Sequence, residues 1–221
     1  MSSLLGAVPV ELFNPVTLLI FIMLFVMSLI AVSVGIFKTL QFRRMGVGHR
    51  NAGEKMLQNW LSGQPDRALL EAKARKSVLA RVLEAVFTGL QSKPNDPSYA
   101  EELGRQSAII ELARMSDRMR LLEMVVQAAP MLGLLGTVVG MIDAFAALSQ
   151  SSGAVDPAAL AGGIWSALTT TATGLMIALV AYFVATWLEG RIERERNLME
   201  TIISAAIHGR VDHGTSNAKA G

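Results

Sequence analysis

The chain has 221 residues, of which 52% are hydrophobic and 17% charged, and its mean hydropathy is +0.42. Soluble domains of this length carry about 25% charged residues, so the composition argues against an ordinary soluble globule. The absence of cysteine excludes a disulfide-stabilised secreted fold and any thiolate metal site. The formal net charge is only +2, and the basic residues alternate with Glu and Asp. We therefore expect no nucleic-acid partner.

Three apolar segments are long enough to cross a bilayer. Val16–Phe37 contains 22 uncharged residues. As a helix it spans roughly 33 Å, and a bilayer core is about 30 Å thick. A second apolar region is divided by the polar stretch 149–157, whose Gly and Pro predict a turn between spans at 124–148 and 158–188. No basic residue precedes the first run, so we interpret it as an anchor rather than a cleaved signal peptide.

The basic residues predict how these spans are oriented. All 20 Lys and Arg fall within 38–120 and 191–219, outside the three spans. The positive-inside rule therefore places both parts in the cytoplasm, and residues 1–15 and the turn outside. The sequence predicts an all-α membrane protein with three transmembrane helices, the N-terminus outside and the C-terminus inside.

Residues 38–123 form an insertion large enough for a cytoplasmic helical domain. Apolar residues at helical spacing predict helices that are broken at Gly63–Pro65 and again at Ser92–Pro97. From Tyr99 to Ala129 there is no proline and the helical pattern persists. We therefore expect one continuous helix to run from this domain into the second span.

The third span also continues as a charged helix, at 189–207, and the polar residues 208–221 are expected to be a disordered tail. No nucleotide-binding loop, metalloprotease motif or nucleophile motif occurs, and the three histidines have no partners at ligand spacing. The sequence therefore predicts no enzyme, no cofactor and no metal site.

Small residues recur along the second and third spans at helical spacing. Gly136 and Gly140 form a GxxxG pair, and Gly163, Ala167 and Thr171 lie four residues apart on one face. Small residues let helix backbones approach closely in lipid. The expected packing residues are Gly133, Gly136, Gly140, Gly163, Ala167 and Gly174.

The same spans carry hydroxyl groups, and these allow two interpretations. Five of them fall within residues 166–173, and Thr137 lies in the second span. Polar groups within a span often face a bundle interior or a water-filled path, which predicts a pore lined by Thr137, Ser166, Thr170 and Thr171. Alternatively, each hydroxyl bonds to its own helix or to a neighbour in a packing contact.

Asp143 is the only acidic or basic residue within the three spans. It lies five residues from the outer end of the second span, so it can handle protons, form a salt bridge or simply reach interfacial water. No span has a carboxylate at its centre. A proton path through this chain would therefore need an acid from a partner.

The segments Pro130–Ile142 and Gly163–Leu175 resemble the MotA/TolQ/ExbB proton channel family, most closely its ExbB/TolQ branch. The resemblance covers nearly the whole chain and implies a five-fold ring of subunits around single-span partners of the ExbD/TolR type. Such a partner supplies a transmembrane Asp, and a TonB/TolA-like transducer can act downstream. By motif position, the resemblance implies that Thr137 and Thr171 face the pore near that Asp.

The resemblance implies a proton-conducting stator in the inner membrane of a Gram-negative bacterium. It would energise outer-membrane transport or envelope maintenance through the proton motive force. One departure matters, because many members carry Glu where this chain has Ser166. A membrane scaffold without ion conduction remains the alternative, as does a stator of another motor in the family, although flagellar-type stators usually have a fourth span.

Overall fold

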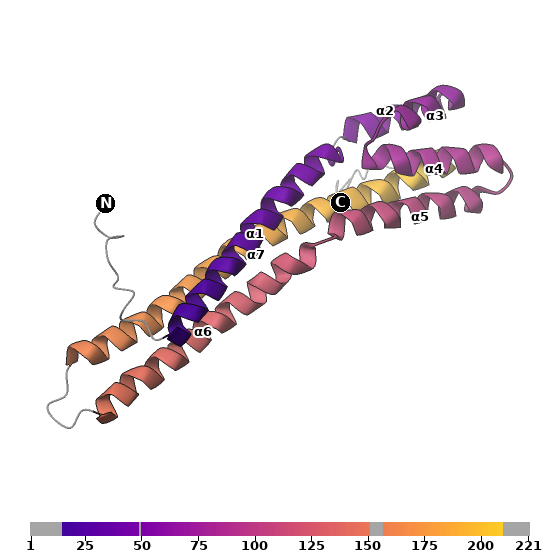
Figure 1. Cartoon of the computed structure of the whole chain (residues 1–221). Coiled ribbons are helices and arrows are strands. Elements are labelled where there is room, and N and C mark those ends of the chain that lie inside the picture. Colours follow the sequence, from indigo (N-terminus) through magenta and orange to yellow (C-terminus); the bar gives the residue numbers. More distant parts are fainter. Residues whose placement is uncertain (1–14, 49, 151–156, 210–221) are drawn as a thin grey trace, which may run out of the picture. The chain divides into compact units, whose positions relative to one another are not determined.

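A computed structural model describes residues 15–48, 50–150 and 157–209, and these residues form seven α-helices and no strand (Figure 1). The helices are α1 (Pro15–Arg44), α2 (Arg50–Leu61), α3 (Pro65–Ala74), α4 (Val78–Ser92), α5 (Pro97–Ser116), α6 (Met119–Gln150) and α7 (Pro157–His208). Three of them, α1, α6 and α7, are long and apolar enough to cross a membrane. The predicted all-α fold with three spans is confirmed.

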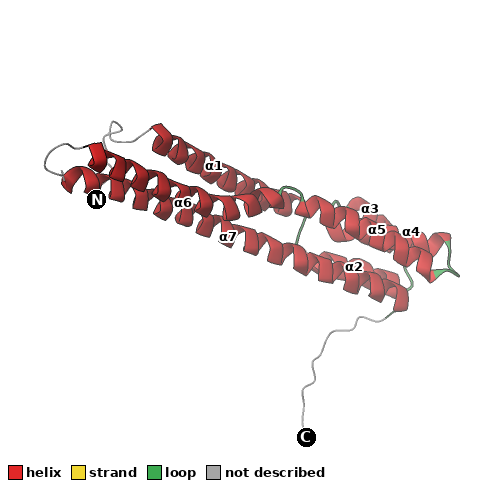
Figure 2. Cartoon of the chain, turned by 90° about the horizontal axis from the view of Figure 1, so that it is seen from below, coloured by secondary structure: helices red, strands yellow, loops and turns green. Residues whose placement is uncertain are grey.

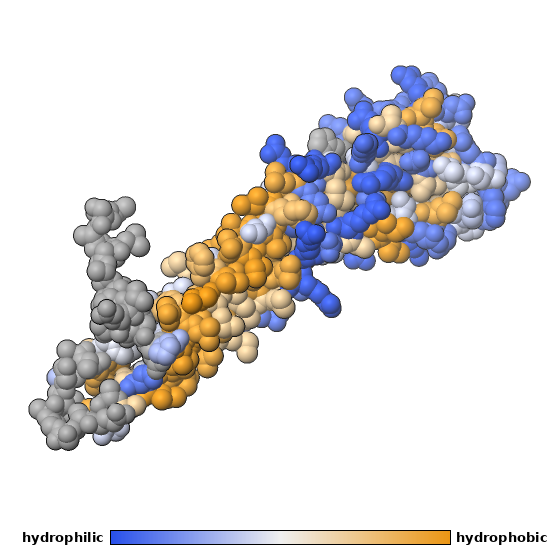
Figure 3. Space-filling model, in the orientation of Figure 1, coloured by the Kyte–Doolittle hydropathy of each residue, from blue (hydrophilic) through white to orange (hydrophobic). Residues whose placement is uncertain are grey.

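The chain divides into two compact units, and the division crosses α1 and α7. The first, called the membrane unit, contains the described residues up to Ile36 and the stretch Arg118–Thr186. The second, called the helical domain, contains Phe37–Asp117 and the described residues from Trp187 onward. Most of the visible surface of the membrane unit is apolar, whereas that of the helical domain is mostly hydrophilic (Figure 3).

In the membrane unit, α6 and the first half of α7 run side by side with α1 beside them (Figure 2). A Cβ atom added to Gly35 would lie 3.2 Å from Val184, so α1 also packs closely on α7. Each long helix presents one narrow buried stripe. The stripe of α6 consists of Leu122, Val125, Ala129, Gly133, Gly136, Gly140 and Ala144.

The helical domain is built around α4, which buries one broad apolar face. Phe87 on this face is fully buried and stacks on Trp60 of α2, with 4.3 Å between the ring centroids. A Cβ atom at Gly104 of α5 would meet Val86 at 2.5 Å and Ile203 of α7 at 3.3 Å. The C-terminal part of α7 therefore belongs to this core.

The two predicted breaks in the helical domain are confirmed. α2 ends at Leu61 and α3 begins at Pro65, with Gly63 between them at φ 77°, a conformation that glycine adopts without strain. α5 begins at Pro97, and the Asp96 side chain caps it by accepting a hydrogen bond from the backbone N–H of Tyr99.

The predicted continuous helix from Tyr99 into the second span is wrong at one point. α5 ends at Ser116 and α6 begins at Met119. Between them Arg118 has φ 64°, in the left-handed region that side chains rarely adopt. The third span does continue as expected, because α7 runs without a break to His208. His208, predicted as the first residue of the disordered tail, is instead the last residue of α7. The predicted N-terminal segment before Pro15, the centre of the predicted turn and the tail beyond Gly209 lie outside the described residues.

Candidate functional site

The two segments that carry the family resemblance lie against each other in the membrane unit. A Cβ atom at Gly140 of α6 would lie 2.8 Å from the Cβ of Ala167 on α7. One at Gly163 of α7 would lie 2.8 Å from the Cβ of Ala144 on α6. Real Cβ atoms essentially never have contacts below 3.0 Å, so these glycines bring the two backbones closer than alanine would allow.

Two of the close approaches between the helices involve backbone atoms. A Cβ atom at Gly174 would lie 2.5 Å from the carbonyl oxygen of Ala129. One at Gly133 would lie 3.0 Å from the Cα of Thr171. Because a backbone atom inside a helix cannot move aside as a side chain can, this part of the contact is the least tolerant of added volume.

Thr171 links the two helices by a hydrogen bond. Its hydroxyl donates to the carbonyl oxygen of Gly133 at 2.7 Å, and its side chain is half-buried. The donated proton leaves the lone pairs of the hydroxyl oxygen available as acceptors. The group can therefore also receive a hydrogen bond from water or from a protonated acid.

Thr170 differs from its neighbour because its side chain is fully buried between α6 and α7. Its hydroxyl donates to the Ala167 carbonyl of the same helix at 2.6 Å, and the side chain fills the space opposite Gly136. Thr170 was predicted to line a pore, but its side chain has no exposed surface in this chain. Its contacts favour packing between α6 and α7.

The other two predicted pore residues are partly exposed. Ser166 is half-buried on α7. Thr137 is half-buried on α6, and its hydroxyl donates to the Leu134 carbonyl at 2.6 Å. Beside Thr137, Val138 and Ile142 expose 52% and 61% of their surface, so this face of α6 is covered by no described residue.

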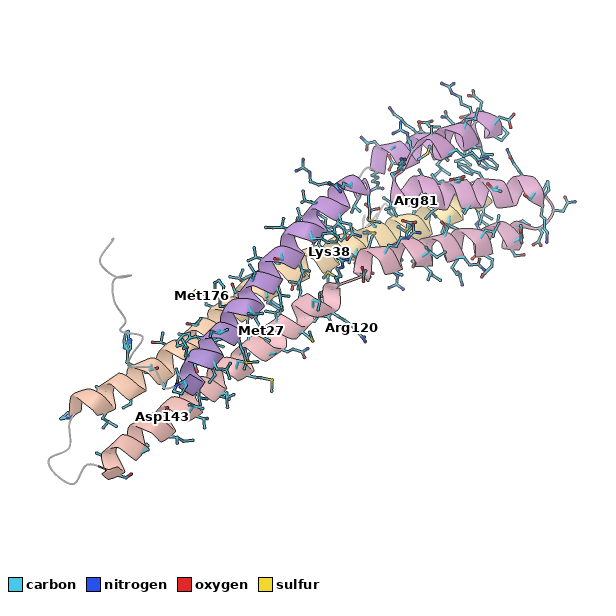
Figure 4. The ribbon with its side chains drawn as sticks, in the orientation of Figure 1. Met27, Lys38, Arg81, Arg120, Asp143 and Met176 are labelled. Atoms are coloured by element: carbon cyan, nitrogen blue, oxygen red, sulfur yellow. The ribbon has the colours of Figure 1, made fainter. Side chains whose placement is uncertain are left out.

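Asp143 lies in the last two turns of α6, seven residues before the helix ends at Gln150, and it is half-buried (Figure 4). The next residue, Ala144, belongs to the contact with Gly163. Asp143 therefore lies beside the small-residue contact but about three helical turns from Gly133, at 3.6 residues per turn. Its neighbour Ala144 meets Gly163, whereas Thr171 lies at the other end of the contact, opposite Gly133.

Two partners in this contact were missed by the sequence reasoning, which named glycines, hydroxyls and, among the alanines, Ala167. Ala129 and Ala144 are both buried. Ala129 packs against Gly174, and Ala144 packs against Gly163. Both continue the stripe of small residues in α6 by four positions, Ala129 before Gly133 and Ala144 after Gly140. Extending the small-residue spacing in both directions would have found them.

The sequence profile of the MotA/TolQ/ExbB proton channel family matches residues 69–201, which include all of α4, α5 and α6 and the whole contact with α7. The chain belongs to this family. It is thus a multi-pass membrane protein of a family of proton channels.

Individual relatives agree with the family. A biopolymer transport protein ExbB homolog of Methanothermobacter thermautotrophicus is 33% identical over 136 residues, which are 61% of this chain and 46% of that protein. The biopolymer transport protein exbB1 of Vibrio cholerae is 44% identical over 63 residues, which are 28% of each chain. A biopolymer transport protein ExbB-like 3 of Synechocystis is 26% identical over 160 residues, 72% of this chain and 74% of that protein. The chain covers less than half the length of the first two.

Proposed function

We propose that the chain is the proton-conducting stator subunit of an inner-membrane motor driven by the proton motive force. Family membership supports ion conduction, and the names of the relatives support a task in biopolymer transport. The proposed location is the inner membrane of a Gram-negative bacterium, and the proposed task is to energise outer-membrane transport or envelope maintenance.

The observation that carries the proposal is the bond from the Thr171 hydroxyl to the Gly133 carbonyl. It fixes a half-buried hydroxyl at the contact of the two family segments while leaving its oxygen free to accept a further hydrogen bond. A neutral carboxylic acid inside a membrane needs such an acceptor for its O–H. Thr171 is therefore suited to hold a protonated acid that arrives from outside this chain.

The acid must come from a partner in this proposal, because Asp143 is the only acid within the predicted spans and lies far from Thr171. We propose a homo-oligomer, in the five-fold form that the family resemblance implies, around a single-span ExbD/TolR-like protein that carries a transmembrane Asp. A TonB/TolA-like transducer would receive the resulting motion. Thr137 and Ser166 would complete the polar lining.

The proposed cycle depends on neutralising the partner's acid. A proton from the outside protonates this carboxylate, Thr171 accepts its hydrogen bond, and the neutral group crosses apolar surface at a lower cost. Moving one charge across 100 mV releases about 2.3 kcal/mol, which is enough to bias a rotation or a stroke.

Proton flux in liposomes that contain the chain and its single-span partner tests the proposal. Thr171→Val keeps the shape but removes the acceptor, so we expect at least a tenfold loss of flux with assembly intact. Thr171→Ser should retain most of the flux. Thr201→Val is the control, since the Thr201 hydroxyl bonds within the helical domain to Asn197 at 2.8 Å.

Normal flux in Thr171→Val would remove Thr171 from the proton path. An assembled wild-type complex that carries no flux under an imposed potential would instead support the structural-scaffold alternative.

A further inference from the structure

A groove lies in the helical domain where the last turns of α1 meet α4 and α5, and its volume is about 900 Å³. Its lining combines apolar and basic side chains. Among them are Phe37, Leu40 and Ile110, and Arg44, Arg81 and Arg114. Arg81 projects from α4 (Figure 4), whereas Arg44 ends α1.

Two hydrogen bonds join the end of α1 to the end of α5 beside the groove. The fully buried Lys38 donates from Nζ to the carbonyl oxygen of Met115 at 2.9 Å. One turn later, Nε2 of Gln41 donates to the Arg114 carbonyl at 3.2 Å. Both bonds therefore fix the two helix ends that line this part of the groove.

The groove lies at the level where a lipid head group is expected. The uncharged run of α1 ends at Phe37, and Arg44 follows seven residues later. At about 1.5 Å per residue, Arg44 lies roughly 10 Å beyond the apolar segment. The head-group region on each side of a bilayer is about 5–8 Å thick, so the groove starts at the end of the apolar segment and extends across this region.

The groove carries an excess of positive charge. Glu111 is buried beneath it and forms ion pairs with Arg114 at 2.7 Å and with Arg81 at 3.2 Å. Asp117 is the acidic residue in the lining, and Arg44 forms no ion pair with any residue that the structure describes. Three guanidinium groups and the Lys38 ammonium stand against the carboxylates of Glu111 and Asp117, so positive charge is in excess and favours an anionic group such as a phosphodiester.

The apolar part of the lining distinguishes a lipid from a soluble anion. Phe37, Leu40 and Ile110 expose 46%, 50% and 53% of their surface. A free phosphate would leave these side chains uncovered, whereas the glycerol and first acyl carbons of a phospholipid would cover them. The wall also contains Arg81 Nε, a buried donor without a hydrogen-bond partner.

We propose that this groove is a binding site for one anionic phospholipid of the cytoplasmic leaflet, with its phosphate at Arg44 and Arg114 and its acyl chains along Phe37 and Leu40. The site needs neither the pore nor the partner's acid. It would fix the depth of α1 in the bilayer by holding the end of the span at the phosphates.

Native mass spectrometry of the full-length protein, released from nanodiscs of phosphatidylglycerol and phosphatidylcholine, tests the site. Arg44→Gln should lower the retained phosphatidylglycerol about fivefold, the ratio expected for loss of one basic residue at a membrane surface. Arg44→Lys should retain it. Arg43→Gln is the matched control, because Arg43 is the exposed neighbour of Arg44 but does not line the groove.

Equal retention by Arg44→Gln and Arg43→Gln would overturn the proposal, as would equal binding of the two lipids to the wild type. Displacement of the lipid by millimolar inorganic phosphate would show a soluble-anion site instead. Loss of subunit assembly in Arg44→Gln alone would show that a second copy of the chain occupies the groove. Selective loss of phosphatidylglycerol with unchanged assembly and thermal stability supports the site.

Discussion

Helix α7 passes through both units of the molecule, and what it buries changes along its length. Within the membrane unit its fully or nearly buried residues are small, namely Ala167, Thr170, Gly174, Ala178, Ala181 and Ala185. Within the helical domain they are mostly large or charged, including Leu188, Glu195, Met199, Ile202 and Ile203. One continuous helix thus packs through small residues in the membrane unit and mostly through large side chains in the helical domain.

The solvent around each unit explains the difference. In lipid no hydrophobic effect draws helices together, so the membrane unit packs by close backbone approach and interhelical hydrogen bonds. In water the burial of large side chains supplies the main driving force, and the helical domain uses it around Phe87. The exposed surfaces follow the same rule, because large apolar side chains such as Phe183 face outward in the membrane unit.

The largest effect on stability is expected from a substitution at Phe87, in the core of the helical domain. Phe87→Ala should lower the free energy of unfolding by about 3–5 kcal/mol, since it empties a buried site and removes the stack on Trp60. Phe183→Ala should have a much smaller effect, because its ring is 64% exposed. Thermal unfolding of both variants in the same detergent measures the difference. Equal losses would mean that large apolar side chains stabilise both units alike.

A smaller effect is expected from added volume in the membrane unit. Gly174→Ala should cost about 1–3 kcal/mol, because the new methyl group would meet the Ala129 carbonyl at 2.5 Å. Gly190→Ala on the same helix should be neutral or stabilising, since nothing lies within 4 Å of its Cβ position. Unfolding midpoints and assembly on size-exclusion chromatography give the answer. Full stability of Gly174→Ala would show that the two helices do not depend on this approach.

The smallest effect concerns the start of α5 in the helical domain. A hydrogen bond from Ser98 at 2.6 Å and one from the Tyr99 N–H hold the pKa of Asp96 below its ordinary value of 3.8. The charged carboxylate therefore stabilises the folded state above that value, and the contribution is lost as the pH falls through the lowered folded pKa.

Hydrogen exchange of the Tyr99 amide measures this cap. Asp96→Ala should speed the exchange at neutral pH, and wild-type protection should weaken on acidification through the lowered pKa. Asp66→Ala is the control, because Asp66 lies in the first turn of α3 but does not cap it. Unchanged exchange in Asp96→Ala would mean that packing alone fixes the start of α5.

Several features could be predicted because they depend on local pattern alone. The uncharged run Val16–Phe37, the breaks at Gly63–Pro65 and Ser92–Pro97, and the small-residue spacing of the two family segments each carry their own signal. The break at Arg118 carries none. No Gly or Pro marks it, and the apolar spacing from Met115 to Met119 and Leu122 continues across it.

The sequence by itself determined the three spans, the side of the membrane predicted for every basic residue, and the absence of an acid at the centre of any span, because composition and hydropathy act residue by residue. Only the tertiary structure decided which hydroxyls reach the other helix. Thr170 and Thr171 are neighbours of the same type, and both hydroxyls point to the Gly133 carbonyl. Thr171 donates to it at 2.7 Å, whereas Thr170, buried opposite Gly136, lies 3.5 Å from it and donates within α7 to Ala167 at 2.6 Å. The rotation of α7 against α6 separates them, and that rotation is fixed by the glycine contacts as a set.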